Sequence, residues 1–127
     1  MARDRTQELA AGGPYSGFKY ALLATIPNGQ ALSEVVDLGP LRLGAIAFPP
    51  AWTAASLTFS VGYDGANVTD LLDATGTEYS ITVTAGKVQI VTIPDFLTFN
   101  TIRLRSGPSA AAVNQGADRL FGLLLVP

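Results

Sequence analysis

Hydrophobic and polar residues alternate along most of this chain with a period of two, which is the spacing of a half-buried β-strand. Residues 56–62, with the sequence Ser-Leu-Thr-Phe-Ser-Val-Gly, give the clearest example. Residues 18–26 and 78–84 repeat the pattern, and each run ends at a turn signal, Pro-Asn-Gly or Ala-Gly. We therefore expect strands whose apolar side chains face a core and whose Ser and Thr side chains face outward.

Further segments of the chain also have the composition of strands. Residues 118–126 are almost continuously apolar, which predicts a strand covered on both faces. Residues 68–74 are ambiguous, because Leu71-Leu72 suits either a strand or one helical turn. The remaining expected strands are 31–38, 41–48, 87–93 and 98–105, with Arg103 and Arg105 facing out. Strands spaced by about 8–12 residues indicate a sandwich or a barrel, and we predict an all-β, two-sheet antiparallel sandwich of the jelly-roll kind.

The length and the distribution of breaking residues suggest one domain with an arm. A chain of 127 residues has the size of a single domain. Residues 1–16 begin polar and then reach Ala-Ala-Gly-Gly-Pro, which interrupts regular structure. We expect an N-terminal arm over 1–16 and a sandwich domain over 17–127. The arm is either a frayed terminus or a segment that orders on a neighbouring subunit.

Charge narrows the range of partners. Only 14% of the residues are charged, below the usual quarter, so part of the surface is expected to be covered by a partner. The net charge of −2 argues against a nucleic-acid partner, which would require a basic stripe. The longest apolar run is residues 120–126, far short of the ~20 residues that span a bilayer, so no membrane partner is expected.

The chain contains no His and no Cys. This absence removes the commonest general base, the commonest nucleophile–base pairs and the zinc sites built on either residue. We therefore expect no enzyme, no catalytic residues and no cofactor. Asp64, Asp70 and Asp73, with Asn67 among them, could hold Ca²⁺. Their spacing matches no EF-hand, however, and Asp and Asn are common in turns, so no metal is predicted.

Two aromatic residues next to predicted turns are candidates for a glycan platform, which needs exposed rings beside hydrogen-bonding groups. They are Trp52 and Tyr63. The alternative interpretation of Trp52, in the sequence Pro-Pro-Ala-Trp, is that its ring closes one end of the sandwich.

Three stretches of the sequence carry a resemblance to a known family of proteins. The first is Ile-Pro-Asn-Gly-Gln-Ala-Leu-Ser at 26–33, leading to Val-Asp-Leu-Gly at 36–39. The second is Phe-Pro-Pro-Ala-Trp-Thr-Ala-Ala-Ser-Leu-Thr-Phe at 48–59, followed by Tyr-Asp-Gly at 63–65. The third is Ile-Arg-Leu-Arg-Ser-Gly at 102–107 with Val-Asn-Gln-Gly-Ala-Asp-Arg at 113–119. In these stretches the chain resembles small virion proteins of tailed bacteriophages, and it is similar to β-sandwich capsid decoration (cement) proteins.

The resemblance implies a structural protein that binds the outer capsid surface and stabilises the head. It implies the major capsid protein and the chain itself, as a homotrimer, as partners, and the virion surface as location after synthesis in the host cytoplasm. Basic residues that could make assembly contacts are Arg3, Arg5, Arg103 and Arg105. The alternatives are another virion component (head–tail connector, tail or fibre-base protein) and a carbohydrate-binding module.

Overall fold

The structure is a computed structural model, and it describes residues 20–63, 67–91 and 99–127. Within these ranges the chain forms nine strands and no helix, which confirms the all-β prediction. The described part likewise contains no helix long and apolar enough to cross a membrane. The strands are β1 (Tyr20–Ile26), β2 (Leu32–Asp37), β3 (Arg42–Ala47), β4 (Ser56–Gly62), β5 (Thr69–Asp70), β6 (Ser80–Thr82), β7 (Val88–Ile90), β8 (Thr101–Ser106) and β9 (Arg119–Val126).

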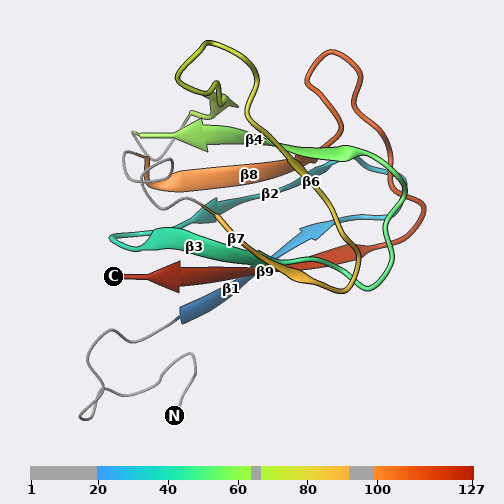
Figure 1. The fold of residues 1–127 in the computed structure, drawn as a ribbon, viewed down its shortest axis with the longest axis horizontal. Coiled ribbons are helices and arrows are strands. Elements are labelled where there is room, and N and C mark those ends of the chain that lie inside the picture. The colour runs from blue at the N-terminus through green and yellow to red at the C-terminus, as the bar shows by residue number, and fades with distance from the viewer. Residues whose placement is uncertain (1–19, 64–66, 92–98) are drawn as a thin grey trace.

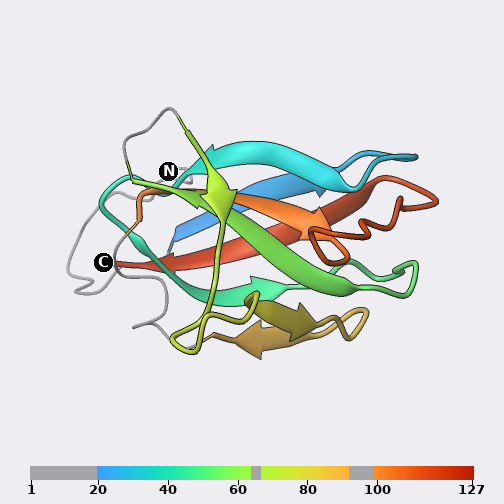
Figure 2. The ribbon, with the colours of Figure 1, turned by 90° about the horizontal axis from the view of Figure 1, so that it is seen from above.

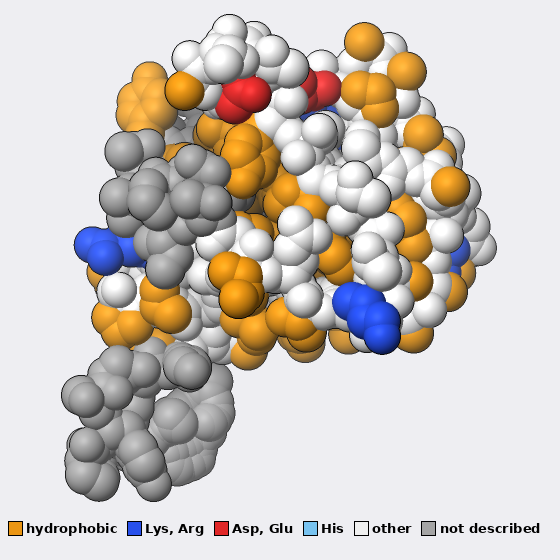
Figure 3. Space-filling model, viewed as in Figure 1, with side chains coloured by type: hydrophobic (Ala, Val, Ile, Leu, Met, Phe, Trp, Pro, Cys, Tyr) orange, Lys and Arg blue, Asp and Glu red, His pale blue; other side chains and the backbone are white. Residues whose placement is uncertain are grey.

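The strands form two antiparallel sheets that pack face to face (Figures 1 and 2). One sheet, here called the β9 sheet, has the strand order β1-β9-β3-β7. The other, the β8 sheet, has the order β2-β8-β4-β5, and β6 also pairs with β4. The two-sheet antiparallel sandwich predicted from the alternation is therefore confirmed. On the side of the molecule shown in Figure 3, charged side chains are sparse, in line with the low charge of the sequence.

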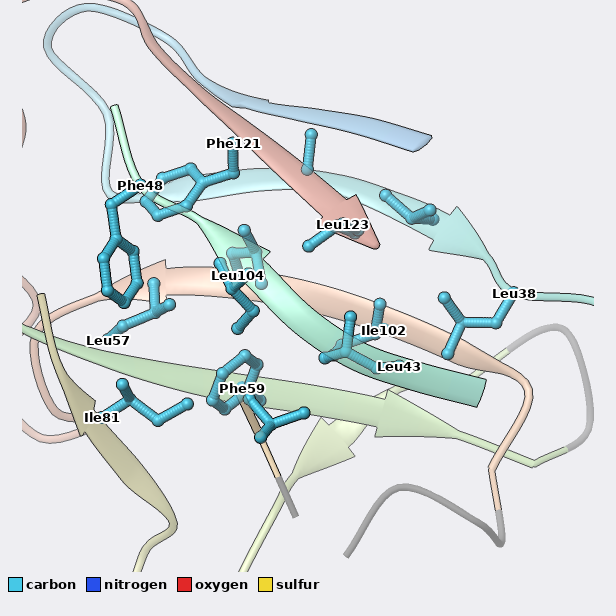
Figure 4. Close-up of a cluster of buried hydrophobic side chains, with 14 of the residues drawn as sticks. Leu38, Leu43, Phe48, Leu57, Phe59, Ile81, Ile102, Leu104, Phe121 and Leu123 are labelled. Atoms are coloured by element: carbon cyan, nitrogen blue, oxygen red, sulfur yellow. The ribbon is translucent and has the colours of Figure 1, made fainter. Parts of the chain in front are cut away.

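The core lies between the sheets and is built from alternate residues of the central strands (Figure 4). Leu57 and Phe59 on β4 and Ile102 and Leu104 on β8 face the β9 sheet and are fully buried. Phe121, Leu123 and Leu125 on β9 close the core from the opposite side. Burying each such side chain stabilises the fold by about 1.5–3 kcal/mol. The period-two pattern thus identified the core side of these strands correctly.

The turn signals lie where the chain reverses. Gly29 and Gly86, the glycines of the Pro-Asn-Gly and Ala-Gly signals, have φ angles of 78° and 74°, which a residue with a Cβ rarely adopts. The ambiguous residues 68–74 form no helix: Thr69 and Asp70 pair with β4, Leu72 bridges to Glu78, and a turn begins at Ala74. The Asp64-Gly65 turn lies outside the described residues, as does the predicted arm over 1–16.

Two expectations about exposure were wrong. Thr58 on β4 points away from the core as predicted, but it is buried because it accepts a hydrogen bond from Nε of Arg105 and donates one to the carbonyl of Gly107. Residues 118–126 were expected to be covered on both faces. In β9 one face is buried, whereas Leu120 on the other face remains 51% exposed, since no described element packs over it.

Candidate functional site

Arg105, a predicted assembly contact, is already paired with other residues of its own chain. Its side chain is only 10% exposed and lies on the outer side of β8. Its Nη1 is 2.9 Å from Oδ1 of Asp70, its Nη2 is 2.9 Å from Oε2 of Glu78, and its Nε donates to Oγ1 of Thr58 at 3.0 Å. Because the guanidinium fork is paired on three sides, this arginine joins β8 to the segment that carries β5 and β6.

The same cluster reaches the loop after β8. The carboxylate of Glu78 also accepts the backbone N–H of Ser109 at 3.1 Å. The neighbouring Arg103 donates from Nε to the carbonyl oxygen of Ser33 on β2, at 2.7 Å. Arg103 and Arg105 therefore organise the outer face of the β8 sheet. Arg3 and Arg5 lie outside the described residues.

Trp52 and Tyr63 are not brought together. Trp52 is half-buried, its ring meets Phe121 edge to face at 5.4 Å between centroids, and its Nε1 donates to the carbonyl of Ala55. Tyr63 is 80% exposed and directly follows the last residue of β4, whereas Trp52 precedes the first. Seven strand residues extend over roughly 23 Å, so the two rings lie at opposite ends of the sandwich and form no common platform.

Two of the acidic residues considered as calcium ligands, Asp70 and Asp73, are engaged within the chain, and Asp64 lies outside the described residues. Asp70 pairs with Arg105, and Oδ1 of Asp73 accepts hydrogen bonds from Thr75 and Thr77. These bonds, above all the one from the Thr75 hydroxyl, lower the pKa of Asp73. The part of the chain that the structure describes contains no group of three His, Cys, Asp or Glu side chains placed to hold a metal ion.

The sequence pattern did not identify Gln115 as an important residue. It lies in the loop before β9, is 1% exposed, and uses its whole amide. Its Nε2 donates to the carbonyl of Thr53 and to Oγ of Ser106, and its Oε1 accepts from the amide of Thr53 and from Nε of Arg119. Gln115 belongs to the third stretch of the family resemblance, and its role is to fasten three segments at one end of the sandwich.

Phe99 contributes to the lining of two open hollows on the described surface. One, of about 250 Å³, includes Arg42 and Tyr63; the other, of about 460 Å³, includes Asp73 and Tyr79. A catalytic pocket would be expected to combine enclosure with an acid or base poised for proton transfer. Neither hollow shows that arrangement among its described lining residues.

The outer face of the β9 sheet is the most unusual surface of the described part. Strand pairing and burial place alternate residues of all four strands on this face. Its members are Ala21, Leu23 and Thr25 on β1, Leu120, Gly122, Leu124 and Val126 on β9, Arg42, Ala45 and Ala47 on β3, and Val88 and Ile90 on β7. Nine of these positions carry Ala, Val, Ile or Leu. We call this set the apolar face.

The apolar face is largely uncovered. Leu23, Val88 and Ile90 are 61%, 60% and 83% exposed. Arg42, its only charged member among the described residues, is paired across the strands with Val126 and so stands at one end. Figure 3 shows hydrophobic side chains along the lower part of the molecule, where Figure 1 places this sheet. The two interior strands of the face, β3 and β9, include small residues such as Ala45, Ala47 and Gly122.

The two sheets therefore present opposite outer surfaces. A sandwich that stands alone usually places polar residues on both outer faces. The β8 sheet follows this rule in part: Thr58, Arg103 and Arg105 lie on its outer face, although Leu32 and Val35 on β2 are exposed there. The outer face of the β9 sheet is apolar across all four strands. Exposed apolar patches of this kind mark surfaces that another molecule covers. The arrangement can support association, and the described residues offer no comparable support for catalysis.

Comparison with known proteins gives a fold but no family. No protein-family model matches the chain, and no curated protein is similar to it in sequence. Among solved structures, the chain is similar to the SPBc2 prophage-derived protein YomS, with a TM-score of 0.57 and 13% sequence identity. The match covers 92% of this chain and all of that one. The two proteins therefore share this sandwich over nearly their whole length.

Proposed function

We propose that the protein is a structural component of a tailed-bacteriophage particle, which binds the outer surface of the capsid and stabilises the head. The observation on which this proposal depends is the low charge of the chain, whose described arginines and acids are largely paired internally, as suits a domain that lies against other protein subunits. The prophage origin of the similar structure supports a phage setting, and the sequence resemblance to capsid decoration proteins supports the location.

The proposed action is mechanical and needs no chemistry. A decoration protein contacts neighbouring capsid subunits at once, so each bound copy lowers the free energy of the assembled shell relative to its separated subunits. Many weak contacts repeated over a lattice add up through avidity. A chain with no His or Cys, whose described arginines and acids are largely paired internally, suits such a passive role.

The direct test is reconstitution on heads. Purified protein is mixed with expanded heads that lack it, and the heads are then pelleted, quantified and heated. We expect saturable binding and a higher temperature of DNA release than for bare heads. The proposal fails if the protein does not bind or if it is found in the tail fraction of disrupted particles.

A connector, tail or fibre-base role uses the same kind of fold, and copy number separates these roles. Decoration places many copies on each head, whereas a connector or fibre base is present in small numbers set by the symmetry of the tail. Quantitative mass spectrometry of purified particles, with the major capsid protein as internal standard, gives the ratio. We expect the number of copies of this protein per particle to be close to that of the capsid protein. A number far below it would contradict decoration.

A further inference from the structure

We propose that the apolar face is the contact between two copies of this chain, packed face to face. The inference goes beyond capsid binding and does not depend on it. It starts from the distribution of charge over the two outer sheet surfaces. The middle of the apolar face has no charged side chain in the described chain, so a charged partner surface placed against it would lose its hydration without gaining an ion pair.

The second step identifies the partner surface. The outer face of the β8 sheet exposes Leu32 and Val35 on β2 but also contains Arg103 and the Arg105 cluster, so it is a poorer complement for a wholly apolar surface. Of the two outer sheet faces, the apolar face itself is the better match. A surface that pairs with its own copy forms an isologous contact, which closes as a dimer about a two-fold axis. In place of the trimer implied by the resemblance, this face favours a pair.

The third step concerns the size of the contact. Four strands spaced about 4.8 Å apart and roughly six residues long cover about 400 Å² in projection on each copy. Two such faces together fall below the roughly 1,200 Å² at which stable interfaces begin. We therefore expect a dimer that dissociates on dilution and forms where the protein is concentrated, as on the surface of a particle. Arg42, at the end of the face, would lie at the rim, where charge is tolerated.

The experiment is sedimentation of the full chain over a wide range of concentration, with matched surface variants. Leu23→Glu combined with Ile90→Glu places charges on the two outermost strands of the face. The control combines Val35→Glu, on the outer side of β2, with Leu72→Glu; both of these residues are also exposed, at 47% and 53%, but lie off the face. We expect the native chain and the control to dimerise alike. The face variant should remain monomeric with an unfolding midpoint like that of the control.

Oxidative cross-linking provides a second measurement, because the chain has no cysteine of its own. Ala47→Cys introduces a thiol on an interior strand of the face, and Val35→Cys is its control. We expect disulfide-linked dimers from the first and not from the second. A native chain that stays monomeric throughout, a species of three copies, or a face variant that associates normally would each overturn the inference.

The outcomes also separate this inference from the proposed function. A monomeric native chain that binds heads through Leu23 and Ile90 would assign the face to the capsid and overturn the dimer. A protein that dimerises through the face but binds no heads would instead leave the dimer standing and overturn the decoration role.

Discussion

At the level of single residues, Gln115 shows how a loop side chain can determine the shape of a whole end of the sandwich. Its amide makes four hydrogen bonds to three other residues, and its backbone pairs with Gly29 and Gln30. Gln115→Ala would remove the side-chain partner of the half-buried amide and carbonyl of Thr53 and of the buried hydroxyl of Ser106. Because each orphaned buried group costs about 1–3 kcal/mol, we expect a loss of roughly 3 kcal/mol in the free energy of unfolding, measured in urea.

Gln115→Glu is the informative companion to that variant. Glu keeps both acceptor functions of Oε1 but cannot donate to the carbonyl of Thr53 when ionised, so it should fall between the native protein and the alanine variant. If Gln115→Ala changed stability by less than about 0.5 kcal/mol, as ordinary surface substitutions do, the fastening role of this amide would be wrong.

Substitutions of Arg105 and of Arg103 can be compared to measure how much the ion cluster contributes to the stability of the fold. Arg105→Met leaves Asp70 and Glu78 facing each other without their shared cation, whereas Arg103→Met removes a hydrogen bond to a backbone carbonyl. Removing one partner of a buried pair costs about 3–5 kcal/mol, and the partial exposure of Asp70 reduces that value. We expect about 2 kcal/mol for Arg105→Met and about half of that for Arg103→Met. Equal losses in urea unfolding would contradict a special role for the cluster.

Asp73 gives a prediction about pH. Hydrogen bonds from Thr75 and Thr77 stabilise its carboxylate and hold its pKa below the ordinary value of 3.8. A group whose pKa is lowered by folding stabilises the folded state above its unfolded pKa, and that stabilisation is lost as the pH falls through the folded pKa. We therefore expect the native protein to have a stability advantage over Asp73→Asn that is constant well above pH 3.8. That advantage should shrink as the pH falls through 3.8 and below it. An NMR titration midpoint for this carboxyl above 3.8 would contradict the assignment.

At the level of elements, sequence periodicity predicted the long strands and did less well on what joins them. The alternation in 56–62 corresponds to β4 residue by residue, since each inward position there is apolar. Ser33 shows the limit. It is buried at an irregularity in the β2–β8 pairing, where its Oγ accepts the amide of Leu104. A hydroxyl that replaces a backbone acceptor depends on a partner about seventy residues away, which a local pattern cannot reveal.

Two glycines with similar backbone angles give a prediction about the loops. Gly107, after β8, has a φ of 87°, and an added Cβ would lie 2.9 Å from the amide nitrogen of Val113. Gly86 has a φ of 74°, but an added Cβ would meet nothing within 4 Å. The left-handed conformation alone costs a residue with a Cβ about 1–2 kcal/mol. Gly86→Ala should lose about that much, and Gly107→Ala clearly more, as measured by the shift in thermal unfolding midpoint.

The comparison isolates steric contact from backbone strain. If the two variants unfold at the same temperature, the close approach of the loop to Gly107 contributes nothing to stability. If Gly86→Ala is the less stable of the two, the assignment of open space at that turn is wrong.

At the level of the whole molecule, the distinction between the outer surfaces could be predicted only in part. Low charge indicated that something covers this protein, but it did not indicate where. The apolar face combines β1, β3, β7 and β9, which are distant in sequence and come together only through the strand order. Arg105 shows the converse: its alternation predicted that it faces out, which made it a candidate assembly contact, but the chain itself covers it. Surface roles depend on which strands become neighbours, so they follow from topology and not from local periodicity.

The composition of the apolar face predicts how association should respond to salt. Contacts between exposed charges weaken as ions screen them, with a Debye length that falls from about 10 Å at 0.1 M salt to about 3 Å at 1 M. Burial of apolar surface is instead strengthened by excluded salts such as sulfate. Because Arg42 is the one charged member of the face in the described chain, we expect the dissociation constant of the pair to be insensitive to sodium chloride and to decrease in sodium sulfate.

Sedimentation of the native chain in the two salts, at matched ionic strength, makes that measurement. Arg42→Gln is the control, since it removes the one charge on the face among the described residues and should leave the dissociation constant equally insensitive to sodium chloride. Steep weakening in chloride would mean that charged groups elsewhere hold the copies together. In that event the apolar face would not be the contact, even if the protein dimerises.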